Sequence, residues 1–139
     1  HMPGAYWIAG QLTPSAVIQS LATNNILYTY IGGAHGAVMD NTHQMTPLTG
    51  GVTNLVIDFR PSSLNPVSGT ITFDQLQLTM QTGIVNTTDS TFTSTINGAT
   101  TGRVYGGFYG PNADAIGGNF AADLSGTQVI GIFDGKRQP

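Results

Sequence analysis

Apolar and polar residues alternate with a period of two along much of this 139-residue chain. Such alternation is typical of strands that bury one face and expose the other. The segments that show it are residues 26–31, 52–59, 67–80, 91–96, 103–109, 118–124 and 127–133, and the apolar, aromatic residues 5–9 add a candidate first strand. Short turns between these segments make neighbouring strands antiparallel. The pattern predicts an all-β domain of roughly seven to nine strands.

One segment near the N-terminus departs from this period and predicts a helix. Thr13 is placed to cap it, Pro14 suits its first position, and the helix should end near Asn24. Its apolar face would consist of Ala16, Val17, Ile18 and Leu21. We expect this helix to cover one mouth of the sheet structure.

Glycine, proline and asparagine predict where the strands stop. Residues 32–36, with three glycines, should end the strand at 26–31, and residues 38–48 should form a loop. The alternation within 67–80 changes parity at Asp74 and Gln75, which predicts a bulge or a bend. Asn97-Gly98 and residues 123–126 predict hairpin turns.

A sheet of this many strands has to curl or close, and closure removes its vulnerable edges. We therefore expect an eight-stranded antiparallel up-and-down β-barrel with one short N-terminal helix. Side chains fill the interior of a barrel of this size, so any function should lie in the loops. The expected fillers are Phe59, Phe73, Phe92, Phe108, Phe120 and Phe133.

The composition excludes several classes of function. Only 8% of the residues are charged, the net charge is −3, and four Lys and Arg residues cannot neutralise many phosphates, which argues against nucleic-acid binding. There is no cysteine for thiol chemistry and no apolar stretch of about 20 residues that would predict a transmembrane helix. The aspartates fall at turns and strand ends and no nucleophile motif accompanies them, so we expect no enzyme.

The ends of the sequence bear on domain organisation. His1-Met2 is interpreted as a remnant of expression, and residues 3–139 as a single domain. The sequence contains no export signal. We expect such a signal, and any lipid-anchored cysteine, to belong to a longer parent protein.

The most specific pattern lies in the last third of the chain. Gly110-Pro111 should stop the strand at 103–109 and start a single helical turn that ends at Asp114. The spacing is G-x-F-x-G-P-x-A-x-x-x-G-G-x-F, followed by G-x-F-x-G-K. The matching positions are Gly106, Phe108, Gly110, Pro111, Ala113, Gly117, Gly118 and Phe120, then Gly131, Phe133, Gly135 and Lys136. This pattern resembles the end of the β-barrel domain of transferrin-binding-protein-B-like bacterial surface lipoproteins.

The resemblance implies a fold and a class of function. It implies a barrel in the cell envelope of a Gram-negative bacterium, on the surface or in the periplasm, that binds a host protein such as transferrin or haemoglobin, or haem, in nutrient acquisition. The matching residues are structural, so the partner and the oligomeric state stay open. The alternative is a structural barrel, or one recognised during assembly or export, with no ligand.

The candidate ligand residues are His35, Met39, His43 and Met45, which are close together in sequence. Histidine and methionine are common ligands of haem iron, so haem is the candidate cofactor here, whereas two solvent-exposed loop histidines are the default interpretation. Their spacing matches no metal motif, and we expect no metal. A second candidate is the aromatic group Tyr6, Trp7, Tyr28 and Tyr30, which would form either part of the core or an exposed binding patch.

Overall fold

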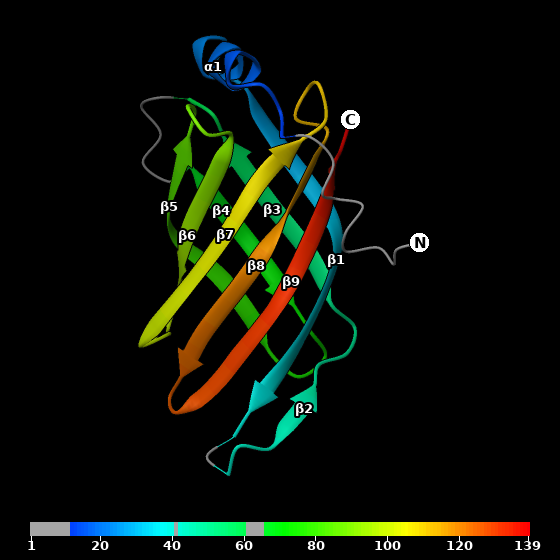
Figure 1. The fold of residues 1–139 in the computed structure, drawn as a ribbon, viewed down its shortest axis with the longest axis vertical. Helices are drawn as coiled ribbons and strands as arrows, with labels where there is room; N and C mark the ends of the chain where they lie inside the picture. The colour runs from blue at the N-terminus through cyan, green and yellow to red at the C-terminus, as the bar shows by residue number, and fades with distance from the viewer. Residues whose placement is uncertain (1–11, 41, 61–65) are drawn as a thin grey trace.

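A computed structural model describes residues 12–40, 42–60 and 66–139. The elements are α1 (Ser15–Thr23), β1 (Leu27–Met39), β2 (Met45–Pro47), β3 (Val52–Asp58), β4 (Val67–Thr72), β5 (Gln77–Asn86), β6 (Thr91–Ile96), β7 (Thr101–Tyr109), β8 (Ala115–Leu124) and β9 (Thr127–Arg137). Strands β3 to β9 pair antiparallel in chain order, and β1 pairs with both β3 and β9, which closes the sheet (Figure 1). Among the described strands, β1 and β3–β9 form an eight-stranded up-and-down barrel. The predicted fold class is confirmed.

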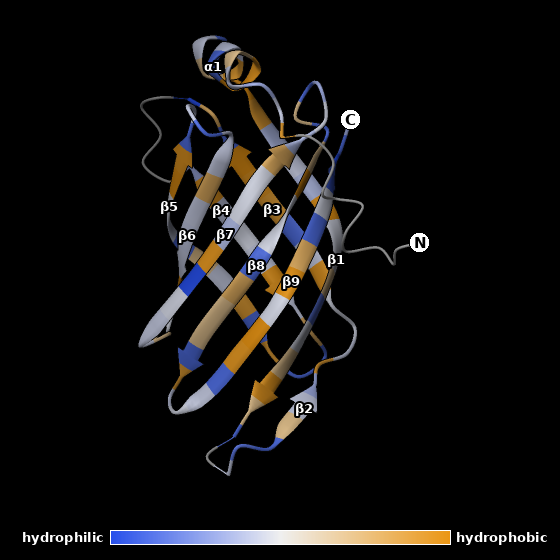
Figure 2. Cartoon of the chain, viewed as in Figure 1, coloured by the Kyte–Doolittle hydropathy of each residue, from blue (hydrophilic) through white to orange (hydrophobic). Residues whose placement is uncertain are grey.

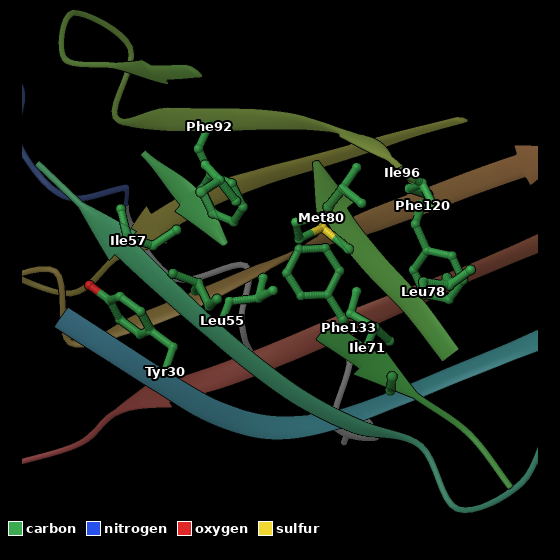
Figure 3. Close-up of a cluster of buried hydrophobic side chains, with 14 of the residues drawn as sticks. Tyr30, Leu55, Ile57, Ile71, Leu78, Met80, Phe92, Ile96, Phe120 and Phe133 are labelled. Atoms are coloured by element: carbon green, nitrogen blue, oxygen red, sulfur yellow. The ribbon is translucent and has the colours of Figure 1, made fainter. Parts of the chain in front are cut away.

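The barrel interior is filled by side chains from every wall. Buried positions alternate with exposed ones along the strands, as in β6, where Phe92, Ser94 and Ile96 point inward. All six phenylalanines are at most 4% exposed, which confirms the predicted fillers. Figure 3 shows part of this cluster, in which Phe92 and Tyr30 extend from different strands into the interior where Met80 and Leu55 lie. The interior is therefore a packed core.

Helix α1 lies across one end of the barrel (Figure 1). Ile18 is fully buried and anchors the helix to the core, as the apolar face predicted. The predicted Thr13 cap is wrong, because Pro14 occupies the cap position and the Thr13 hydroxyl donates to the carbonyl oxygen of Gly110 at 2.8 Å. Within the described part of the chain, no helix is long and apolar enough to cross a membrane.

The glycines at 32–36 do not end the first strand, contrary to the sequence prediction. β1 runs without a break from Leu27 to Met39 and pairs with β9 along Ala34 to Met39. A side chain at Gly32 would collide with the backbone oxygen of Asp134 on β9. Glycine here permits close approach of two strands rather than a turn.

Of the predicted bulge or bend at Asp74 and Gln75, the bend is confirmed and the bulge is not, because the segment 67–80 is two strands that meet there. β4 and β5 pair antiparallel, and the amide of Phe73 donates to the carbonyl oxygen of Leu76 at 2.8 Å to form the hairpin turn between them. The change in parity marked a reversal of chain direction. The predicted turn at 123–126 is confirmed, with positive φ at Ser125 and Gly126.

Candidate functional site

The four predicted ligand residues lie along one β-hairpin. His35 and Met39 are on the outer face of β1, Met45 on β2 pairs directly with Met39, and His43 lies in the turn between the strands. The predicted loop at 38–48 is therefore corrected to the end of β1, a tight turn and β2. We call residues 39, 40 and 42–47 the arm. It projects past the end of the barrel opposite α1 (Figure 1).

A single carboxylate organises the turn of the arm. Oδ1 of Asp40 accepts hydrogen bonds from the Thr42 hydroxyl at 2.6 Å, the Thr42 amide at 2.9 Å and the Gln44 amide at 3.0 Å. These bonds stabilise the ionised form and lower the pKa of Asp40, the Thr42 hydroxyl having the largest effect. The amide of His43 also donates to the carbonyl oxygen of Asp40 at 3.0 Å. The arm thus ends in an ordered turn.

The hairpin does not bring His35 and His43 together. His35 is four residues from Met39 on one strand, a separation of about 13 Å. His43 is at the far end of the arm, with φ of 63°. No group of three or more His, Cys, Asp or Glu side chains that could hold a metal ion occurs within residues 12–40, 42–60 and 66–139. The arm instead presents Met39 and Met45 as a neighbouring pair, with Met45 47% exposed.

The Gly-Pro motif forms a turn between β7 and β8 that other elements bond to. Its residues 110–113 are a turn with φ of 88° at Gly110 and 57° at Ala113, so the predicted helical turn is wrong. The carbonyl of Gly110 accepts from Thr13, and the carbonyl of Ala113 accepts from the Tyr30 hydroxyl at 2.8 Å. The motif therefore connects the segment before α1, strand β1 and the β7–β8 turn.

The C-terminal strand closes the same region. The Arg137 guanidinium donates to the carbonyl oxygen of Asn112 at 2.9 Å and lies 3.7 Å from Asp114. It also sits over the ring of Tyr28 at 4.7 Å from the centroid, a cation–π contact. These contacts show that the motif residues stabilise the end of the barrel that α1 covers.

The spacing of glycine and phenylalanine in the motif has a packing reason. Phe108 and Phe120 point into the core, at 0% and 2% exposed. A side chain at Gly106 would collide with the ring of Phe92, which lies opposite it on β6. Glycine in the motif thus leaves the space that the neighbouring phenylalanine rings occupy.

The aromatic candidate group is divided by the structure. Tyr6 and Trp7 lie outside the described residues. Tyr30 is fully buried, and Tyr28 packs edge-on against Phe59 with centroids 5.9 Å apart. Of the two interpretations, core packing holds for the described pair.

Two features escaped the sequence interpretation. The first is the pairing of Met45 with Met39, because Asp40 between them is a turn signal but the three residues of β2 show no strand pattern. The outer wall carries exposed apolar side chains, including Ile130 at 46% and Ile132 at 40%. The pattern Val129-Ile130-Gly131-Ile132-Phe133 contains no polar position and was the available signal.

Comparison with known proteins places this fold. A family model described as the C-lobe and N-lobe beta barrels of Tf-binding protein B matches residues 23–137. Isotype 1 transferrin-binding protein B from serogroup B Neisseria meningitidis is 22% identical, with a TM-score of 0.71, over 94% of this chain and 28% of that chain. A mutant transferrin-binding protein B from Haemophilus parasuis Hp5 is 21% identical, with a TM-score of 0.66, over 94% of this chain and 29% of that one. No curated protein sequence matches.

The two solved structures match this chain over only part of their own length. The chain spans less than a third of the length of either solved structure. At such low identity, the structural matches indicate the fold alone.

Proposed function

The chain belongs to the family of transferrin-binding protein B lobe β-barrels, and from this premise we propose that it binds a host iron-carrier protein at a bacterial cell surface. The family consists of binding proteins rather than enzymes, which confirms the prediction of a non-catalytic domain. Its relatives are named for transferrin, so transferrin is the first partner to test.

The packed interior supports a partner bound from outside the barrel. Tyr30, Leu55 and Phe108 are each 0% exposed, and side chains of this kind fill the described core. A lipocalin-like ligand inside the barrel would need space that these side chains occupy. A protein partner needs only a surface, which the ends and the outer wall of the barrel supply.

The arm is the observation that carries the proposal. It projects from the barrel, its turn is ordered by three bonds to Asp40, and it presents the exposed Met45 beside Met39. An ordered turn lowers the entropic cost of binding, and methionine side chains adapt to a partner's surface. We therefore assign Met39, His43 and Met45 of the arm to contact with the carrier, with no cofactor required, whereas His35 lies on the barrel wall outside the arm.

Localisation follows from the same premise. Named relatives include a surface lipoprotein, which is 15% identical over 82% of this chain. We propose that this barrel is likewise displayed at the outer membrane surface as part of a longer protein. Surface display would give the arm access to a host protein.

Binding to purified iron carriers tests the proposal. Immobilised protein is titrated with iron-loaded transferrin, iron-free transferrin and lactoferrin, with serum albumin as the negative control. We expect saturable binding to one carrier, and a loss of affinity of about tenfold or more in a Met39→Ser, Met45→Ser double variant. Ile84→Ser, which changes a 65% exposed side chain on β5, is the matched control. The proposal is wrong if no carrier binds the folded protein, and the arm is not the site if both variants bind equally.

A second candidate function is a structural or assembly module without a ligand. The observation that favours it is the short, bonded turns at the barrel ends, such as the Gly126 amide donating to Asp123 at 2.9 Å. Under this alternative the arm variants change nothing, and no carrier binds.

Haem capture is tested by titration and a pair of substitutions. Titration with haemin would shift its Soret band if His35 or His43 coordinated iron. A His35→Ala, His43→Ala double variant should then abolish the shift. A shift that survives in this variant would exclude these histidines as ligands.

A further inference from the structure

The outer wall formed by β7, β8, β9 and β1 carries apolar side chains in register. One row across these strands consists of Tyr105, Asn119, Ile132 and His35. The next row consists of Arg103, Ala121, Ile130 and Ala37, and a third contains Asp123. Tyr105, Ile130 and Ile132 are 50%, 46% and 40% exposed. The hydrophobic stretch of β9 can be followed in the wall that faces the viewer in Figure 2.

This wall is hollowed on both sides of Ile130. A shallow apolar depression of about 530 Å³ lies between Ile130 and Ile132 of β9 and His35 and Ala37 of β1. A second hollow of about 750 Å³ lies on the other side of Ile130 and includes Arg103 and Asp123. Ile130 thus stands as an apolar ridge between an apolar hollow and a charged one.

Arg103 and Asp123 form no ion pair with any residue that the structure describes. In the part of the chain that the structure describes, Arg60 and Arg137 have carboxylate partners, whereas Arg103 has only the ring of Tyr105, at 5.6 Å. Asp123 uses Oδ1 to accept the amide of Gly126 and makes no ion pair. Around Ile130 the wall therefore offers Arg103 and Asp123 on neighbouring strands, in neighbouring rows, while Asp134 and Lys136 lie further along β9.

We propose that this wall is a homodimer interface, occupied by the same wall of a second copy of the chain. When two walls meet face to face about a two-fold axis in the plane of contact, a residue of one copy faces the residue of the other copy that lies equally far on the opposite side of the axis. Strands are about 4.8 Å apart and same-face rows about 6.8 Å apart. We place the axis next to Ile130, oblique to both the strands and the rows. Arg103 then lies opposite Asp123 of the second copy, and Ile132 lies opposite Ala37 of the second copy.

Symmetry makes each of these contacts occur twice. Two Arg103–Asp123 ion pairs would flank a centre formed by the two Ile130 side chains, and each Ile132 would fill the apolar depression beside Ala37. Like charges do not meet in this arrangement. The wall is thus complementary to itself in both charge and shape, which is the basis of the inference.

The size of the wall sets the expected strength. Two curved barrel walls meet over less area than a standard interface of about 1,600 Å². We expect a reversible dimer that forms as concentration rises towards about 1 mM, rather than a permanent one. The inference goes beyond the proposed function and does not depend on which carrier binds.

Sedimentation velocity across a concentration series tests the interface. The 139-residue chain should show a monomer–dimer equilibrium, Ile130→Asp should remain monomeric, and Ile84→Asp, with a 65% exposed isoleucine on β5, should behave like the parent. A chain that stays monomeric up to about 1 mM overturns the proposal. So does an equal effect of the two aspartate variants.

A charge exchange tests the assigned axis. Arg103→Asp and Asp123→Arg should each weaken dimerisation about tenfold, and the double variant should recover it, because the exchanged charges again meet across the axis. Asp123→Asn is included because it keeps an oxygen acceptor for Gly126 while removing the charge. Melting curves verify that each variant folds; if Asp123→Arg does not, Asp123→Asn must weaken the dimer by itself. Unaltered dimerisation in the folded Arg103→Asp and Asp123→Asn variants contradicts the proposal.

Discussion

The hydroxyl of Tyr30 donates a 2.8 Å hydrogen bond to the carbonyl oxygen of Ala113, 83 positions later in the chain. Both residues are fully buried. The bond joins the first strand of the barrel to the Gly-Pro turn between β7 and β8, near the strand that closes the barrel. It gives the motif turn a structural role that its sequence alone does not reveal.

Removal of the Tyr30 hydroxyl should destabilise the fold. Tyr30→Phe leaves the carbonyl of Ala113 buried without this donor, so we expect a loss of about 1–2 kcal/mol in the free energy of unfolding. Urea denaturation at neutral pH measures it. Tyr105→Phe, on the exposed outer wall, is the control and should change stability by less than about 0.5 kcal/mol. Equal effects of the two substitutions would contradict the role assigned to this bond.

The same residue predicts a loss of stability at high pH. Burial raises the pKa of Tyr30 well above its ordinary value of 10.0, because the charged phenolate is disfavoured inside the barrel. The unfolded chain ionises first, so the free energy of unfolding should fall as pH rises above about 10. Denaturant titrations at several pH values should give a steeper fall for the parent than for Tyr30→Phe. Parallel curves would show that this group does not contribute.

A methyl group at Gly106 should be poorly tolerated. Gly106→Ala would press against the ring of Phe92, which is 1% exposed and held by Phe108 at a centroid distance of 5.2 Å. We expect a destabilisation of about 1–3 kcal/mol from overpacking. Gly33→Ala is the matched control, because its added methyl would have the backbone oxygen of Gly51 as a neighbour at an ordinary 3.9 Å. A Gly106→Ala variant as stable as Gly33→Ala would mean that the core is looser than described.

The order of the arm should depend on Asp40. Asp40→Ala removes the acceptor of three hydrogen bonds, so the amides of Thr42 and Gln44 should exchange with solvent faster while the barrel strands stay protected. Because those bonds lower the pKa of Asp40 below 3.8, the ordering effect is present above that pH and is lost as pH falls through the depressed pKa. Asp40→Asn should retain part of it. Unchanged exchange in Asp40→Ala would show that the turn is ordered by other means.

Sequence reasoning succeeded where local chemistry and the fold agree. Alternation predicted strands such as Thr91–Ile96, and the six phenylalanines filled the core because each occupies an inward position of a regular strand. The barrel followed because strands joined by short turns pair with their neighbours. Ser125-Gly126 formed the expected hairpin because both residues adopt positive φ.

The prediction failed where one residue type serves two purposes. The glycines at 32–36 have the chemistry of a break, but long-range contact with β9 uses Gly32 for close approach. The parity change at Asp74 fits either a bulge or a hairpin, and pairing between β4 and β5 selects the hairpin. The self-complementary outer wall could not be foreseen, because it depends on register across four strands rather than on any local pattern.

Hydrogen exchange with and without iron-loaded transferrin tests the central claim most directly. The account predicts that the bound carrier protects the amides of the arm and leaves the amides of the α1 end unchanged. Asp40→Ala should bind more weakly and show less protection in the arm. Protection confined to other parts of the chain would refute the arm as the contact site, and no protection at saturating transferrin, lactoferrin or other carriers would contradict the proposed binding function itself.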